Sequence, residues 1–271
     1  MKNKTLTVIG TAVLALAPFG SPNVASATCS AIPVGQFEPG VQFNFWCQQS
    51  WVNFYWSAHD FDQGDWDEGF GFEDPCNLSL PLGRTFNALE VLNYAAPVDA
   101  TSTGDFSGNI LHWGGNYAIR EIDELDASCS TASRAYTAFG PIIDNYTELR
   151  IPAFYNENVV ERAGTILHES RHADYCGHSG NDGTNPCLSR SESCDESFDD
   201  GCAGVGSPSG RGATGYQALW LWWFTVEADA VHGTTPMKDM ARIEANRIFD
   251  TMFDVRPCFN ITNTGQIVTT C

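Results

Sequence analysis

Basic residues are scarce in this 271-residue sequence, and their scarcity excludes two kinds of partner. Lysine and arginine number 14 against 33 aspartates and glutamates, which gives a formal net charge of −19 at pH 7. A nucleic-acid-binding surface needs clustered lysine and arginine to neutralise phosphates, and docking on an anionic membrane needs the same side chains. We therefore expect neither nucleic acid nor a membrane among the partners, and the oligomeric state stays open.

The sequence also lacks any cysteine pair in the C-x-x-C spacing that zinc ribbons use. It nevertheless contains ten cysteines, an even number. In an exported protein such a set predicts disulfides and no free thiol, although sequence spacing does not reveal the pairing. We therefore expect a disulfide-stapled protein, with Cys187 as one possible partner of Cys176.

The first 27 residues have the pattern of a secretory signal peptide. Lys2 and Lys4 precede an apolar run from Leu6 to Phe19, and Ala25-Ser26-Ala27 has the form of an A-x-A cleavage site. The apolar run is short for a membrane span, which needs about 20 residues. We expect a signal peptide over residues 1–27 and a secreted protein, in the extracellular space or the periplasm.

Residues 28–271 are expected to form a single domain with two parts of different composition. The chain is 43% hydrophobic and 12% aromatic, enough for a core. Aromatic and acidic residues dominate the part up to about residue 100, and the candidate metal ligands lie in the part from about 101 to 271. The acidic stretch 60–74 raises the question of calcium, but Asp65 and Gly71 stand where an EF-hand needs glycine and glutamate. We favour a solvated acidic loop over a calcium site.

The middle of the chain, residues 85–155, mixes short apolar runs with turn residues. We predict short strands and connections there, including Asn109–Gly115 and Glu148–Tyr155. A helix is predicted from about residue 157, because Asn158 and Glu161 have the spacing of a capping box. Its apolar residues repeat at helical spacing: Val159, Ala163, Ile166 and Leu167.

Two more helices are predicted towards the end of the chain. One runs from Thr214 to His232; its segment Leu219–Val226 is apolar on all sides, so we expect it to be buried. The next begins at Thr235-Pro236 and ends before Pro257. The methionines Met237, Met240 and Met252 fall in this helical pattern and are expected to pack in the core.

The strongest functional signal is the segment His168-Glu169-Ser170-Arg171-His172. Residues four apart on a helix share one face, so both imidazoles can reach one metal ion. Glu169 lies about 100° round the helix from His168, where its carboxylate can take a proton from a metal-activated water. The alternative is a polar helix face whose two histidines only make hydrogen bonds.

A catalytic zinc ion needs a third protein ligand, and three candidates compete. His178 lies ten residues after His168. Glu227 lies on an otherwise apolar helix, where a carboxylate needs a partner; that partner could also be an arginine. The acids Asp195 and Glu196 are the third possibility. We predict His178, because imidazole is a common zinc ligand.

Segment 158–178 resembles the active-site helix of the zincin metallopeptidases. The resemblance implies that His168 and His172 bind zinc and that Glu169 is the general base. His178 has the spacing of the third histidine in the metzincin subgroup, although Tyr175 stands where that subgroup has glycine and Gly177 directly precedes His178. Glu227 resembles instead the third ligand of gluzincins, with Asp229 or His232 in support.

The same resemblance implies a fold and a reaction. The fold is α+β, with a small mixed sheet before the active-site helix and helices after it. The edge strand of that sheet would pair with an extended substrate, and we expect Thr147–Tyr155 to be this strand. The expected activity is zinc-dependent hydrolysis of a peptide or protein substrate. Two alternatives remain: a non-catalytic exported binding protein with a structural metal, and a zinc hydrolase that cleaves a different bond.

Overall fold

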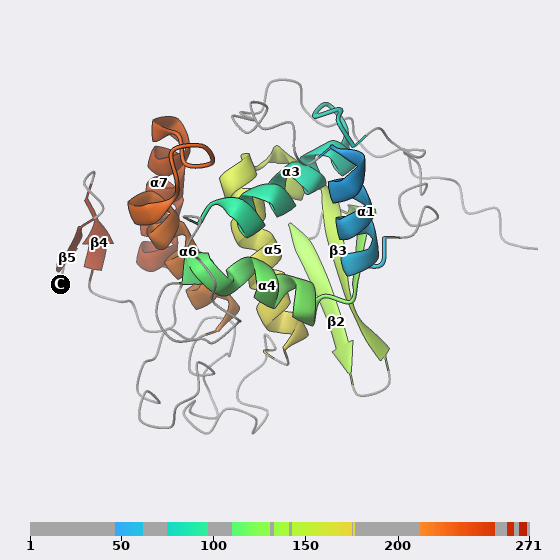
Figure 1. Cartoon of the computed structure of the whole chain (residues 1–271). Coiled ribbons are helices and arrows are strands. Elements are labelled where there is room, and N and C mark those ends of the chain that lie inside the picture. Colours follow the sequence, from blue (N-terminus) through green and yellow to red (C-terminus); the bar gives the residue numbers. More distant parts are fainter. Residues whose placement is uncertain are drawn as a thin grey trace, which may run out of the picture.

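The chain folds as an α+β protein, as predicted (Figure 1). The structure, a computed structural model, describes residues 47–61, 75–96, 110–130, 133–140, 143–174, 176, 212–252, 259–262 and 266–269. Within these ranges the helices are α1 (Gln49–Ala58), α3 (Pro81–Tyr94), α4 (Ile110–Glu121), η2 (Phe154–Asn156), α5 (Val159–Ala173), α6 (Ala213–Glu227) and α7 (Thr235–Thr251). The strands are β1 (Glu124–Ser130), β2 (Ala135–Gly140), β3 (Ile143–Pro152), β4 (Phe259–Ile261) and β5 (Ile267–Thr269).

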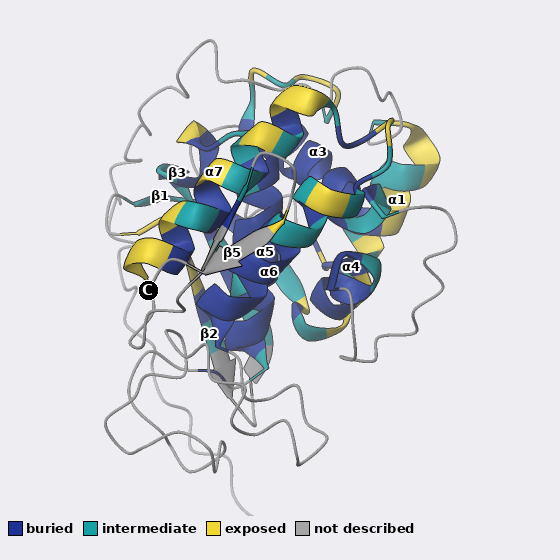
Figure 2. Ribbon diagram, turned by 90° about the vertical axis from the view of Figure 1, so that its left-hand side faces the viewer, coloured by how far each residue is buried: buried dark blue, intermediate teal, exposed yellow. Residues whose placement is uncertain are grey.

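Helix α5, which carries the histidine–glutamate motif, is the central element of the fold. The sheet lies on one side of it, α6 and α7 lie on the other, and α3 and α4 pack across it (Figure 1). Nearly all of its residues are buried (Figure 2). The helix begins as predicted: the Asn158 side chain accepts hydrogen bonds from the amides of Val160 and Glu161, and the Glu161 carboxylate accepts one from the Asn158 amide.

The described strands of the larger sheet lie in the order β1-β3-β2. Strand β3 is parallel to β1 and antiparallel to β2, so both of its edges are paired. The prediction that Thr147–Tyr155 forms an edge strand is therefore wrong. The strand ends at Pro152, and its parallel partner comes from residues 124–130, a pairing that local sequence does not indicate. The edge strand that packs against α5 is β2.

The prediction of a short strand or connection at Asn109–Gly115 is also wrong, because residues 110–115 form the first part of helix α4. Ile110, Trp113 and Tyr117 form a buried stripe at helical spacing. Gly115 permits close contact with α3: a Cβ at this position would lie 2.4 Å from Oδ1 and 2.8 Å from Cα of Asn93. Gly115 thus serves helix packing, whereas in the sequence the pair Gly114-Gly115 has the form of a turn.

Helices α6 and α7 begin close to where they were predicted, but α6 ends earlier than expected. Its last residue is Glu227, because Ala228 takes an extended conformation and the Asp229 amide donates to the Ala95 carbonyl at 3.0 Å. In α7, Met237 is buried as predicted, whereas Met252 is 40% exposed. No helix in the described ranges is both long and apolar enough to cross a membrane.

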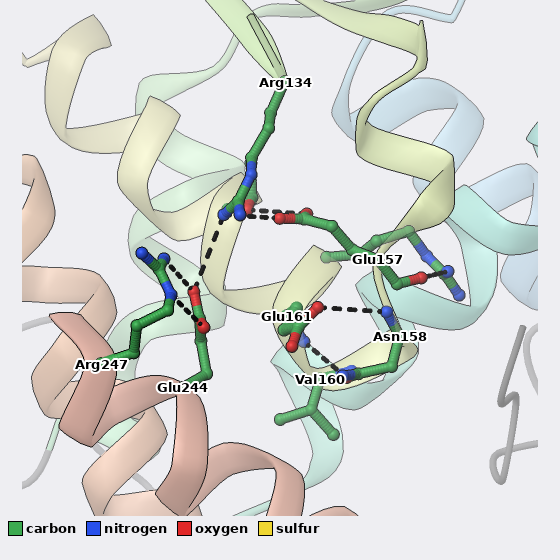
Figure 3. Close-up of polar contacts among 9 residues, drawn as sticks. Arg134, Glu157, Asn158, Val160, Glu161, Glu244 and Arg247 are labelled. Carbon is green, nitrogen blue, oxygen red and sulfur yellow. Dashed lines mark hydrogen bonds and ion pairs between the residues drawn. The ribbon is translucent and has the colours of Figure 1, made fainter.

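An ion-pair network joins the start of α5 to α7 and to the residue preceding β2 (Figure 3). Arg134 Nη1 lies 2.7 Å from Glu157 Oε1 and 3.7 Å from Glu244 Oε1. Arg247 contacts both carboxylate oxygens of Glu244. Burial raises the pKa of Glu157 to about 7, and Arg134 opposes this shift.

Disulfides stabilise the described part of the chain, as the cysteine content predicted. Cys47 and Cys76 are bonded to each other and tie the start of α1 to the segment before α3. Cys129 and Cys176 are also disulfide-bonded, and none of the described cysteines is a free thiol. The suggested partner of Cys176, Cys187, lies outside the described residues.

Candidate active site

The structure brings together the two histidines that were predicted to bind zinc. Nε2 of His168 and Nε2 of His172 lie 3.1 Å apart, and the two rings are inclined at 71°. Two nitrogen ligands of one tetrahedral zinc ion, each about 2.0–2.1 Å from the metal, lie about 3.3 Å from each other. The donor type and the spacing of the two nitrogens therefore fit a zinc ion.

The tautomer of His172 also suits metal binding. Its Nδ1 faces the backbone carbonyl oxygen of Cys176, and a carbonyl only accepts hydrogen bonds. The proton of the neutral ring therefore lies on Nδ1, and the lone pair lies on Nε2, the atom directed at His168. Such a bond on the far nitrogen fixes the orientation of a metal-binding histidine.

The side chain of Glu169, a residue of α5, contacts the edge strand β2. Its side chain is buried, and its Oε2 accepts a hydrogen bond of 2.7 Å from the Thr137 hydroxyl on β2. Thr137 in turn lies 2.9 Å from the Thr147 hydroxyl on β3. Strands β1 and β2 are the two edge strands of the described sheet. The predicted general base is thus held against one of these edge strands, β2.

Partly buried polar contacts fix the end of α5 at Asp174. The Arg171 side chain donates to the Asp174 carbonyl at 2.7 Å and contacts its carboxylate at 3.1 Å. Tyr117 of α4 donates its hydroxyl to the same carboxylate at 3.0 Å. These contacts fix the position of Asp174, which precedes by two residues the Cys176 whose carbonyl contacts the His172 ring.

Glu227 is not brought to the histidine pair. Helix α6 runs antiparallel to α5: Arg171 lies over the ring of Tyr216, and a Cβ on Gly164 would lie 3.6 Å from Leu221. Glu227 follows Leu221 by six residues, which places it about 9 Å further along the helix axis, away from the histidines.

The partners of Glu227 and its neighbours confirm this separation. Glu227 Oε2 lies 3.5 Å from His112 Nε2 on α4, where the alternative interpretation expected an arginine. His232 Nδ1 lies 3.1 Å from Asp229, and its Nε2 lies 3.5 Å from Glu90. Asp229 and His232 therefore contact each other and α3, so they do not support Glu227 as a metal ligand.

Several predicted features lie outside the described residues. They are the third ligand His178, the alternative ligands Asp195 and Glu196, residues 62–74 of the acidic stretch and the signal peptide 1–27. Within the described ranges, no group of three or more histidine, cysteine, aspartate or glutamate side chains is placed to hold a metal ion. Of the predicted site, the structure describes His168, Glu169 and His172.

Comparison with known proteins adds no homologue. No family model matches the sequence, and neither the curated proteins nor the solved structures contain a match. A function for this chain is therefore inferred from its own residues.

Proposed function

We propose that this chain is an exported, zinc-dependent metallopeptidase of zincin-like fold. His168, His172 and His178 are the zinc ligands, and Glu169 is the general base. The observation that carries the proposal is the convergence of the His168 and His172 Nε2 atoms, 3.1 Å apart, next to a buried glutamate.

Local contacts within and next to α5 support this role for the two histidines. His172 is almost fully buried, and its hydrogen bond to Cys176 leaves the Nε2 lone pair available. Helix α5 sets the second imidazole one turn away on the same face. When bound, zinc supplies the Lewis acidity that activates water for attack on a carbonyl carbon.

Glu169 is placed to move the proton in this reaction. As a carboxylate next to His168 in the helix, it can accept a proton from the attacking water and pass it to the leaving amine. Its 5% exposure keeps bulk water away from the carboxylate, and Thr137 limits its rotation. Glu169 therefore acts on water and is not itself a ligand.

The edge strand β2 supports a peptide over other substrates. An extended peptide can add to the unpaired edge of a sheet through backbone hydrogen bonds. Strand β2 is such an edge in the described sheet, and it also carries Thr137, which contacts Glu169. A peptide bound along β2 would therefore pass close to the general base.

Chain connectivity supports His178 as the third ligand. The Cys176 carbonyl contacts the His172 ring directly. Two residues of extended chain span at most about 7 Å, and His178 follows Cys176 by two residues in the sequence. Because α5 ends at Ala173, the short sequence separation between Cys176 and His178 supports His178 as the proposed third ligand.

The test is to purify the mature protein and compare it with Glu169→Gln for zinc content and for cleavage of a generic protein substrate. The variant should keep its zinc while its kcat falls by about 10²–10⁴-fold, the contribution of a general base. Treatment with a chelator should abolish wild-type cleavage, and added zinc should restore it. A Glu169→Gln variant that cleaves at the wild-type rate would exclude the proposed mechanism.

A further inference from the structure

Three side chains from three elements form a hydrogen-bonded chain that ends on Glu169. The Thr147 hydroxyl on β3 lies 2.9 Å from the Thr137 hydroxyl on β2, and Thr137 Oγ1 lies 2.7 Å from Glu169 Oε2 on α5. All three side chains are buried, and Thr147 is fully so. Thr137 Oγ1 also lies 3.4 Å from the Glu169 backbone carbonyl, so the hydroxyl rests against this turn of the helix.

The direction of the hydrogen bonds follows from the number of protons. A carboxylate only accepts hydrogen bonds, so the single hydroxyl proton of Thr137 is directed to Glu169. Thr137 Oγ1 must then accept from Thr147, which makes Thr147 the first donor of the chain. Hydrogen bonds arranged in series polarise one another, and this strengthens the bond to the carboxylate.

We propose that Thr137 is a positioning residue for the general base and that Thr147 aligns Thr137. This inference rests on the proposed function of Glu169. Thr137 and Thr147 are directly opposed in the antiparallel pair β2–β3, so the sheet itself sets the position of the donor. Because β2 is also the edge expected to bind the peptide, one strand fixes both the substrate and the base. As a consequence, the distance and orientation of the Glu169 carboxylate relative to the scissile bond would be fixed.

Thr137 could instead have a purely structural role, in which it only supplies a hydrogen bond to the buried Glu169 carboxylate. Kinetic measurements distinguish this structural role from the positioning role. Thr137→Val keeps the branched shape but removes the proton, and Thr137→Ser keeps the proton. Thr165→Val is the matched control. Thr165 is a buried threonine of α5, the helix that carries Glu169, and its hydroxyl donates to another buried glutamate, Glu157, at 3.0 Å. The experiment measures kcat, KM and zinc content for each variant.

Thr137→Val should lower kcat by about 10–100-fold, as is typical when support behind a catalytic group is removed. Its KM and zinc content should stay at wild-type values. Thr137→Ser should restore most of kcat, Thr147→Val should have a smaller effect than Thr137→Val, and Thr165→Val should not change kcat. The proposal is overturned if Thr137→Val matches the Thr165→Val control, or if Thr137→Ser is as impaired as Thr137→Val.

A second measurement does not depend on activity. In the metal-free protein, Thr137→Val should lower the denaturant midpoint of unfolding because it leaves the Glu169 carboxylate without this donor. The same substitution in a Glu169→Ala background should have little effect, since the partner is already gone. Equal shifts in both backgrounds would show that the two residues are not coupled. If they are coupled but Glu169→Gln remains fully active, the positioning contact stands and the peptidase mechanism fails.

Discussion

His172 Nδ1 donates a hydrogen bond to the carbonyl oxygen of Cys176, which lies three residues after the end of α5 in the sequence. This bond connects the end of the motif helix to the segment that leads to His178. It also fixes the His172 tautomer that leaves Nε2 available for a metal. The same contact therefore orients one proposed ligand.

The choice between the competing third ligands can be tested with two substitutions. His178→Ala should weaken zinc binding strongly, because losing one of three protein ligands removes much of the binding free energy. Glu227→Gln should leave zinc bound, since Glu227 lies near His112 at the far end of α6. The measurement is zinc stoichiometry after dialysis against a weak chelator. Metal loss in the Glu227 variant together with retention in the His178 variant would contradict the assignment.

The adjacent glycines of α4 should differ in their tolerance of alanine. At Gly115 a Cβ would lie 2.8 Å from the Asn93 backbone, so Gly115→Ala should destabilise the protein by about 1–3 kcal/mol through overpacking. At Gly114 the nearest atoms are side-chain carbons of Leu167 and Trp220 at 3.3 Å. There the gain in helix propensity, about 1 kcal/mol, should offset most of the crowding.

Denaturant unfolding of both glycine variants provides the measurement. The Gly114→Ala protein serves as the control, because it makes the same chemical change one residue away in the same helix. Equal destabilisation of the two would mean that the close approach of α3 and α4 at Asn93 is wrong.

Glu157 should make the protein less stable as the pH rises. Its pKa is raised from 4.5 to about 7, chiefly by burial, so the folded state disfavours its charged form. Its contribution to stability is therefore complete below pH 4.5 and is lost as the pH rises through 7. Glu157→Gln cannot ionise, so its stability should change less over this range, by up to about 3 kcal/mol for a pKa shift from 4.5 to about 7. Melting temperatures measured from pH 4 to 8 test this, and parallel profiles for the two proteins would disprove it.

The sequence was most informative where the interactions are local. The start of α5 could be predicted because a capping box joins residues three apart, Asn158 and Glu161. The proximity of His168 and His172 could be predicted because histidines four apart share a helical face. Both features depend on helix geometry alone, and tertiary packing did not alter them.

The errors and omissions all depend on contacts between distant segments. Strand β3 could not be assigned to the centre of the sheet, because its parallel partner β1 is separated from it by β2 in the sequence. Helix α4 has the turn-like sequence Gly114-Gly115, whose purpose appears only when Asn93 of α3 lies against it. Thr137 had no local signal, because its contact with Glu169 depends on the β2–β3 register and on how α5 packs against the sheet.

Zinc stoichiometry of the purified mature protein, measured beside His168→Ala and His172→Ala, is the most direct test of the central claim. The facing Nε2 atoms predict one tightly bound zinc ion per wild-type chain, and strongly reduced zinc in both variants. A matched substitution at another histidine, His112→Ala, should leave the zinc in place because His112 contacts Glu227 on α6. A wild-type protein that binds no zinc, or one whose zinc content is unchanged in the His168 and His172 variants, would contradict the metallopeptidase assignment.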